Sequence, residues 1–263
     1  MSTIVSVHSF RGGTGKSNVT ANLAATVAAT GRRVGIVDTD IQSPGIHVLF
    51  GFDETRIERS LNDFLWGRCP IAACAYDVSA ALKRDGTSPP ARSAIYLIPS
   101  CPKAGEIGRI LREGYDVDLL SEGFHTLVDE LHLDYLFIDT HPGLNEETLL
   151  SITISDVLVL ILRPDRQDFQ GTAVTVEVAR KLDVPNLLLV VNKALPEIDA
   201  ADLRQQVEQA YSATVAGVLP LSEDVARLAS SDLFTLRFPE HRWTQQVKSV
   251  AQQIATVAAT SDN

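Results

Sequence analysis

The chain has 263 residues, of which 45% are hydrophobic and 21% charged, a composition typical of an ordinary soluble globular protein with a sizeable core. Its formal net charge of −10 disfavours broad, non-specific binding to DNA or to anionic membranes, while a local basic patch remains compatible with it. No apolar run reaches the roughly 18–20 residues that span a bilayer, and the N-terminus lacks the pattern of a secretion signal, so we expect a cytoplasmic protein.

A glycine-rich turn follows the first predicted strand, residues 3–9, and leads into a helix that begins near Lys16 and stops at Gly31. The turn reads Arg11-Gly-Gly-Thr-Gly-Lys-Ser17. Its three glycines allow successive backbone N–H groups to surround an anion, and the helix N-terminus adds positive charge at the same place. Lys16 supplies a mobile cation, and the Ser17 hydroxyl is placed to bind a metal ion. The pattern therefore predicts a phosphate cradle with a Mg²⁺ site, which the flanking strand and helix favour over a chance glycine-rich turn.

A second predicted strand, Arg33–Val37, runs into Asp38-Thr-Asp40. Acidic residues in this place have two interpretations: the ribose-binding acid of a dinucleotide fold, or a site for Mg²⁺ and water beside the phosphates. The cradle ends in Lys-Ser and lacks the pattern G-x-G-x-x-G, which favours the second interpretation.

The middle of the chain alternates predicted elements with one irregular segment, residues 67–93, which is either a solvated loop with a short helix near Ala80 or a surface that recognises a partner. Around it we expect helices over 56–66, 104–112 and 117–131, and strands over Ala94–Ile98 and Leu133–Ile138, the second of which ends at Asp139. The three cysteines match no zinc-binding spacing, and we expect free thiols in a reducing compartment at Cys69, Cys74 and Cys101.

The last third again alternates strands and amphipathic helices, which is typical of βαβ units and a mostly parallel sheet. The predicted strands are Val157–Leu162, Leu187–Val191 and Thr214–Val218. The helix over 168–182 would bury Val174, Val178 and Leu182, and the next helix Leu203, Val207 and Tyr211. A final helix, residues 243–259, has an apolar stripe that suits packing against the sheet or, alternatively, binding a partner helix; it consists of Trp243, Val247, Val250, Ile254 and Val257.

Several of these motifs together resemble the MinD/ParA ATPases. The glycine turn is similar to their deviant Walker A motif, K-G-G-x-G-K-[ST], with Arg11 in place of the first lysine. The run Asp139-Thr-His-Pro-Gly143 is similar to their Walker B motif and second switch. Asn192 follows a predicted strand where the family has an Asn that binds the base, although an Asx-turn is the alternative from the residue alone. All of these motifs lie at carboxyl ends of strands, where ligands bind in parallel sheets.

The resemblance implies one P-loop NTPase domain over residues 1–263: a three-layer α/β fold with a mostly parallel sheet of seven or eight strands flanked by helices. It implies ATP and Mg²⁺ as cofactors and an ATP-dependent homodimer. The residues that would act in catalysis are Lys16, Asp40 and Arg11, and those that would hold the metal are Ser17, Asp38 and Asp139. The nucleotide would be bound by Gly12, Gly13, Thr14, Gly15, Lys16, Ser17, Asn18, Gly143, Asn192, Pro220, Ser222 and Asp224.

The implied activity is slow ATP hydrolysis that switches the dimer, in intracellular positioning or partitioning, with an unidentified protein partner. Three alternatives differ from it in function. The chain would be a nucleotide-binding scaffold with little hydrolysis, an electron-transferring or metal-inserting relative, or a metabolic kinase or ligase. The second is disfavoured because no cysteine follows Asp139. Membrane anchoring through the last helix is disfavoured because Lys248 is the one basic residue after Arg242.

Overall fold

The computed structural model describes residues 2–83 and 88–261. In these residues eight strands form one sheet in the order β3-β4-β2-β5-β1-β6-β7-β8. Every neighbouring pair is parallel except β3 and β4, which are antiparallel. The predicted mostly parallel sheet is confirmed, with strands β1 Thr3–His8, β2 Arg33–Asp38, β3 Tyr76–Asp77, β4 Ala94–Ile98, β5 Tyr135–Asp139, β6 Val157–Leu162, β7 Asn186–Ala194 and β8 Thr214–Pro220.

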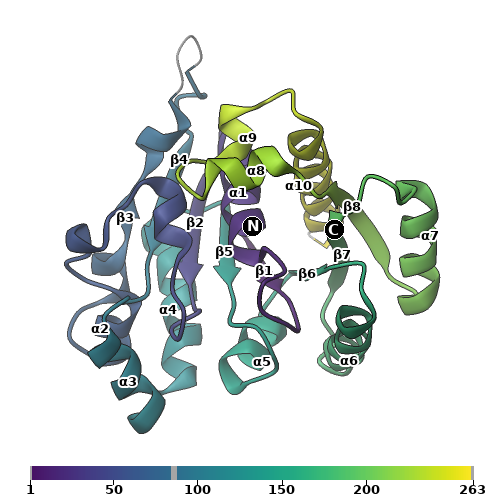
Figure 1. The fold of residues 1–263 in the computed structure, drawn as a ribbon. Helices are drawn as coiled ribbons and strands as arrows, with labels where there is room; N and C mark the ends of the chain where they lie inside the picture. The colour runs from purple at the N-terminus through teal and green to yellow at the C-terminus, as the bar shows by residue number, and fades with distance from the viewer. Residues whose placement is uncertain (1, 84–87, 262–263) are drawn as a thin grey trace.

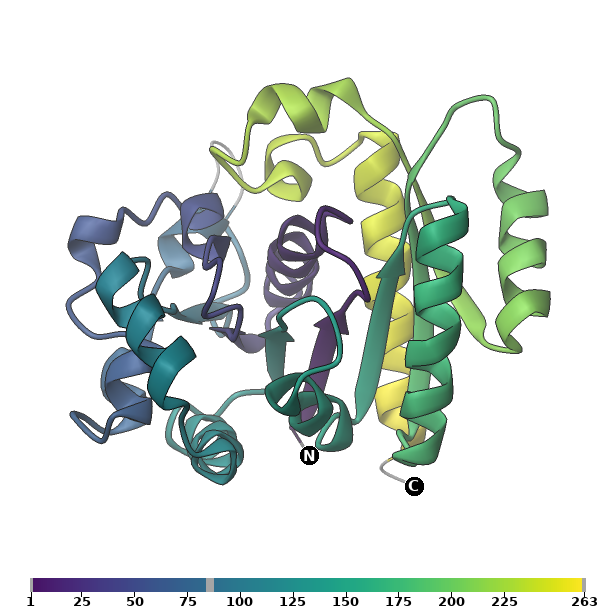
Figure 2. The ribbon, with the colours of Figure 1, turned by 60° about the horizontal axis from the view of Figure 1, so that its bottom comes forward.

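Helices cover both faces of this sheet (Figures 1 and 2). On one face α1 (Lys16–Ala28) and α10 (Arg242–Ser261) share a core with alternate residues of the central strands, and the short α9 (Phe234–Arg237) packs against α1. The other face packs on α2 (Leu61–Leu65) and α4 (Val117–Glu130) at one end. At the other end it packs on α6 (Arg166–Lys181) and α7 (Ala200–Tyr211). Three layers result, and the remaining helices are α3 Ala104–Glu113, α5 Glu146–Thr153 and α8 Glu223–Leu228.

The last helix packs as the sequence indicates. Its predicted apolar stripe faces α1 and β8, and four of the five residues in it are buried: Trp243, Val247, Val250 and Ile254. Among the described residues, no helix combines the length and apolar character that crossing a membrane requires.

The helix expected over residues 56–66 is shorter than predicted. A separate 3₁₀ turn covers Glu54–Arg56, and α2 begins only at Leu61. Ser60 fixes this start, because its backbone N–H and the carboxylate of Asp63 form half of a capping box at 2.9 Å. In the irregular segment 67–93 the short helix near Ala80 is present as a 3₁₀ turn, Ser79–Leu82. The two-residue strand β3 was not predicted, and residues 84–87 of the segment lie outside the described residues.

The buried face of α6 differs from the prediction. Val174 is 47% exposed, and the helix instead buries a row of mostly small or polar residues. The reason is a tertiary contact: Phe10 packs on Gly171, where an added Cβ would lie 2.1 Å from the Phe10 ring. An aromatic ring therefore occupies the place where a side chain at position 171 would otherwise lie, and it sets the rotation of the helix.

Candidate nucleotide site

The glycine-rich turn and the two acidic motifs meet at the carboxyl ends of three adjacent strands. Asp38 at the end of β2 is the register partner of Asp139 at the end of β5, and Val7 of β1 is the partner of Asp139 on its other side. The residues around them enclose a pocket of about 230 Å³, which is lined by Ser9, Gly12, Gly13, Thr14, Gly15, Lys16, Ser17, Asn18, Asp40 and Pro142. Most of the residues expected to bind phosphate thus line one cavity.

Two glycines of the turn adopt the left-handed backbone conformation that non-glycine residues avoid. Gly13 has φ +79° and Gly15 has φ +88°. At Gly15 an added Cβ would also lie 2.7 Å from the side-chain nitrogen of Asn192. Gly15 is the N-cap of α1 and offers no side-chain cap, so the first N–H groups of the helix remain available to a bound anion.

Asn192 and its neighbour Lys193 hold the turn from the end of β7. The Asn192 side chain donates to the Thr14 carbonyl at 2.7 Å, and Lys193 Nζ donates to the Gly13 carbonyl at 2.8 Å. The amide oxygen of Asn192 accepts the N–H of Lys193 at 2.9 Å. The amide therefore contacts the turn in this structure, and its binding of a base stays a prediction. Lys193 was missed by the sequence analysis; its place directly after Asn192 was the available signal.

Three residues expected near the base lie outside the pocket. Pro220, at the end of β8, pairs with Ala194 of β7, and Ala194 is two residues after Asn192. Ser222 caps α8, where its hydroxyl accepts the N–H of Val225 at 3.4 Å. Asp224 forms an ion pair with Arg227 at 3.2 Å. Their roles with the nucleotide stay predictions.

A buried charge cluster lies behind the glycine turn. Lys16 Nζ donates to Asp139 Oδ1 at 3.0 Å, and the Thr20 hydroxyl donates to the same oxygen at 3.0 Å. Asp38 accepts the N–H groups of Asp40 at 3.1 Å and of Gly45 at 3.2 Å. Burial and the neighbouring charge of Asp139 raise the pKa of Asp38 well above its usual value, and the Lys16 ammonium partly offsets this rise.

The donors in this cluster suit a bound Mg²⁺. Asp139 Oδ2 is buried and has no hydrogen-bond partner among the described residues, although a buried carboxylate oxygen normally has one. No group of three or more His, Cys, Asp or Glu side chains in the described part of the chain is arranged to hold a metal by itself. Mg²⁺ does not need such a cage, because it usually binds one or two protein oxygens together with waters and substrate phosphates. Asp139 and the Ser17 hydroxyl beside the cradle fit that pattern.

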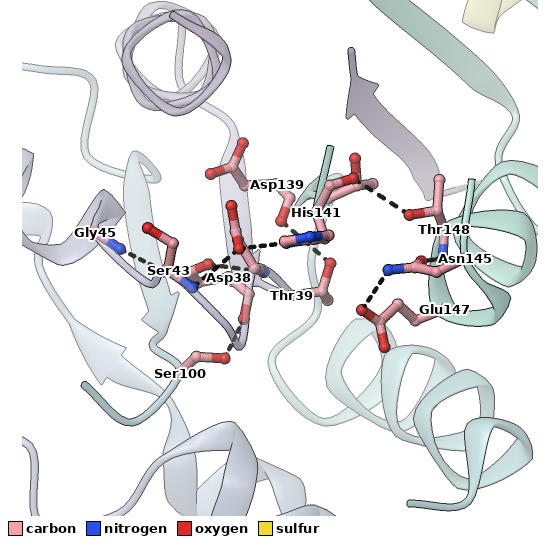
Figure 3. A network of polar contacts seen from close by, with 12 residues as sticks. Asp38, Thr39, Ser43, Gly45, Ser100, Asp139, His141, Asn145, Glu147 and Thr148 are labelled. Carbon is pink, nitrogen blue, oxygen red and sulfur yellow. Dashed lines mark hydrogen bonds and ion pairs between the residues drawn. The ribbon is translucent and has the colours of Figure 1, made fainter. Parts of the chain in front are cut away.

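Asp40 has a partner that the sequence analysis did not assign. Nδ1 of His141 lies 2.7 Å from Asp40 Oδ1, and the N–H of Ser43 donates to the same oxygen at 3.1 Å. Figure 3 shows the His141 ring between Ser43 on one side and Asn145 and Thr148 on the other. His141 belongs to the motif Asp139–Gly143, but nothing in the sequence indicated which residue it contacts.

Two more predicted residues make contacts within the chain. Arg11 donates to the side chain of Gln167 at the start of α6, and its Nε lies 4.0 Å from Asp168. Its side chain remains 40% exposed. Gly143 has φ +92°, and its N–H donates to the Ser9 carbonyl at 3.3 Å. The predicted roles of Arg11 across a dimer and of the Gly143 N–H on a phosphate stay predictions.

A mostly parallel sheet with a glycine phosphate cradle after its first strand, and with aspartates at the ends of the neighbouring strands, defines a P-loop nucleotide-binding protein. A family model described as the CobQ/CobB/MinD/ParA nucleotide binding domain matches residues 5–236, and the chain belongs to this family. The resemblance to MinD and ParA proteins found in the sequence is thereby confirmed.

Individual relatives differ in what their names say. The chain is 23% identical over 255 residues to an uncharacterized ATP-binding protein of Methanocaldococcus jannaschii, covering 97% of this chain and 88% of that protein. It is 30% identical over 202 residues to an iron-sulfur cluster carrier protein of Methanococcus maripaludis, covering 74% of this chain and 62% of that protein. The septum site-determining protein MinD of Pyrococcus horikoshii, solved with Mg-ADP, has a TM-score of 0.78 at 20% identity and covers 99% of this chain and 98% of its own.

Proposed function

We propose that this protein binds ATP with Mg²⁺ in the glycine-turn pocket, hydrolyses it slowly, and uses the bound state to control a homodimer. The observation that supports this most is the meeting of a phosphate cradle with Lys16, Asp139 and Asp40 at one end of the sheet. Phosphoryl transfer to water depends mainly on positioning and on charge neutralisation, and these residues supply both kinds of group.

Each charged residue has a distinct role in this proposal. Lys16 binds the phosphates after leaving Asp139. Asp139 and Ser17 would hold Mg²⁺, which would supply positive charge to phosphate oxygens, and Asp38 would bind the metal's water shell. Asp40, which lines the pocket, orients the attacking water. Release of Lys16 leaves Asp139 without its cation, so a divalent metal at Asp139 compensates a charge that would otherwise be buried and unpaired.

Arg11 links the site to the dimer. A guanidinium binds phosphate through two N–H groups and stays charged, so it can replace a lysine that reaches a partner's phosphates. In the single chain Arg11 is held at the start of α6 by Gln167 and Asp168. It is 40% exposed, and pairs of this kind are weak. Dimerisation with ATP bound would therefore draw Arg11 from its own chain to the partner's nucleotide at small cost.

The output of the switch is proposed to be recruitment of a protein partner in the cytoplasm, in positioning or partitioning. The net charge of −10 disfavours a mechanism based on sliding along DNA. Some relatives are named as iron-sulfur cluster carriers. In this chain all three cysteines precede residue 102. None follows Asp139, so the sequence has no cysteine after the second switch that would support cluster transport.

The proposal is tested by phosphate release together with size-exclusion chromatography and light scattering in apo, ADP and non-hydrolysable ATP states. We expect slow, Mg²⁺-dependent phosphate release and a dimer only with the ATP analogue. Asp40→Ala should slow hydrolysis by about 10²-fold or more and leave ATP binding intact. A monomer in every state would refute the dimer switch, and normal turnover in Asp40→Ala would refute the role of Asp40. Dimerisation without phosphate release would favour the scaffold alternative.

A further inference from the structure

The His141 side chain contacts the candidate site through a hydrogen bond to Asp40. Asp40 lines the pocket, whereas His141 does not. The two residues follow different strands, β2 and β5, and are 101 positions apart in the sequence, yet their side chains approach to 2.7 Å. The hydrogen bond to Asp40 therefore gives His141 a route by which it can act on a molecule in the pocket.

The direction of this hydrogen bond follows from chemistry. An ionised carboxylate only accepts hydrogen bonds, so Nδ1 of His141 is the donor. The second donor to Asp40, the Ser43 N–H, goes to the same oxygen, Oδ1, at 3.1 Å. Among the described residues, both hydrogen bonds to the Asp40 side chain fall on Oδ1. Oδ2 is thus left for a water or ligand.

Fixing this carboxylate matters because of the charges around it. Asp38 and Asp40 are two residues apart after β2, and the Asp38 carboxylate accepts the backbone N–H of Asp40 at 3.1 Å, so the two nearby carboxylates repel each other when ionised. A carboxylate that turned freely would change the direction in which Oδ2 points, and hence its distance from a water held beside the phosphates. The hydrogen bonds from His141 and Ser43 oppose that rotation.

His141 is itself held in place from the opposite side. Its backbone carbonyl accepts the hydroxyl of Thr148 at 3.3 Å, and Asn145 caps α5 by accepting the Thr148 N–H at 2.9 Å (Figure 3). Asn145 also donates to Glu147 at 2.9 Å. The segment after β5 is therefore fastened to the first turn of α5, and the His141 ring starts from a defined backbone position.

We propose that His141 is a positioning residue: it donates from Nδ1 to Asp40 Oδ1 and holds the Asp40 carboxylate so that Oδ2 faces the attacking water. This role rests on the proposed hydrolysis of ATP. The same hydrogen bond fastens the loop after β2 to the loop after β5, so the two acidic segments of the site act as one unit.

The test compares His141→Leu with His141→Asn. The two side chains have nearly the same shape, but the Asn amide nitrogen can occupy the place of Nδ1 and donate, while Leu cannot. We expect His141→Leu to lower kcat by roughly 10- to 100-fold with the KM for ATP and the Kd of a non-hydrolysable analogue unchanged, since small misplacements of reacting groups cost this much. His141→Asn should recover a large part of kcat, and Asp40→Ala/His141→Leu should be no slower than Asp40→Ala.

Several outcomes would overturn the proposal. Equal kcat in His141→Leu and wild type would refute the role of His141 and leave the proposed ATPase standing. Wild-type protein without hydrolysis would refute the proposed function and the role of His141 with it. If His141→Leu unfolds, His141→Gln replaces it, because its amide extends beyond the place of Nδ1; equal rates in the Asn and Gln variants would then refute the positioning role. His125→Asn, at an exposed histidine of α4, is the control and should hydrolyse ATP as the wild type does.

Discussion

We expect His8, the last residue of β1, to make the stability of this fold depend on pH under acidic conditions. Its side chain is completely buried next to the glycine turn. Nδ1 lies 2.7 Å from the Thr140 hydroxyl, which itself donates to the Val7 carbonyl at 3.1 Å. The Thr140 hydroxyl has one proton for two acceptors, so His8 Nδ1 donates to it or accepts from it according to the tautomer of the ring. Burial, followed by the charge of Lys16, lowers the pKa of His8 from 6.5 to about 3.

The pH dependence of stability follows from this pKa. In the unfolded chain His8 takes up a proton near pH 6.5, and in the folded chain only near pH 3. Acidification between these values therefore favours unfolding, and the contribution of a neutral His8 to stability is present above 6.5 and lost as the pH falls toward 3. At pH 5 the loss relative to neutral pH is about 2 kcal/mol. For a chain of this size that corresponds to a fall in Tm of about 4–8 °C.

The perturbation is His8→Asn, which removes the titrating ring and keeps a donor near the position of Nδ1. The measurement is the free energy of unfolding in urea for wild type and variant between pH 5 and pH 7.5, with His125→Asn as the control at an exposed histidine. The variant is expected to be less stable at pH 7.5, because a buried ring is lost, and its deficit should shrink by about 2 kcal/mol at pH 5. Parallel curves for wild type and His8→Asn would refute the reasoning.

Three further substitutions test the site. Lys16→Met leaves the Asp139 charge buried without its partner and should lower the free energy of unfolding of the nucleotide-free protein, measured in urea, by about 3–5 kcal/mol. Adding Asp139→Asn removes that charge and should recover most of the loss. An unchanged urea midpoint for Lys16→Met alone would contradict the buried ion pair. Gly15→Ala should weaken ATP binding, measured by calorimetry, at least about tenfold and more than Gly13→Ala does. At Gly15 an added Cβ would lie 2.7 Å from a neighbouring amide nitrogen, whereas at Gly13 it would meet no described atom within 4 Å. Arg11→Ala should bind ATP with unchanged affinity but fail to dimerise with the ATP analogue in light scattering. Arg11→Lys should restore the dimer. Complete dimerisation of Arg11→Ala would exclude a role of Arg11 at the partner's nucleotide.

The central strands were predictable because their signals are local. Ala94–Ile98 and Val157–Leu162 were predicted with the bounds that the structure gives them. Both are continuous apolar runs, which suits strands that are covered on both faces. The glycine turn was equally clear, because left-handed glycines before a lysine and a helix form a pattern within seven residues.

Elements that depend on tertiary contacts were not predictable in the same way. The buried face of α6 follows from Phe10 packing on Gly171, a contact between residues more than 150 positions apart. The helix α5 was missed because it has only eight residues, and its start depends on the Asn145 cap more than on an apolar period. The contact of His141 with Asp40 required the strand order, in which β2 and β5 are neighbours although β4 lies between them in the sequence.

That strand order also bears on nucleotide binding under the proposed function. Pairing of β2 with β5 puts Asp38 directly opposite Asp139, and the turn after β2 adds Asp40. Three carboxylates thus lie close to the Lys16 ammonium group, and burial together with repulsion by Asp139 raises the pKa of Asp38. Under the proposed function, a divalent cation at Asp139 relieves this repulsion and frees Lys16 for the phosphates. Under that proposal, the charge imbalance would contribute to the free energy that couples nucleotide binding to the positions of the loops after β2 and β5, the two segments that His141 joins.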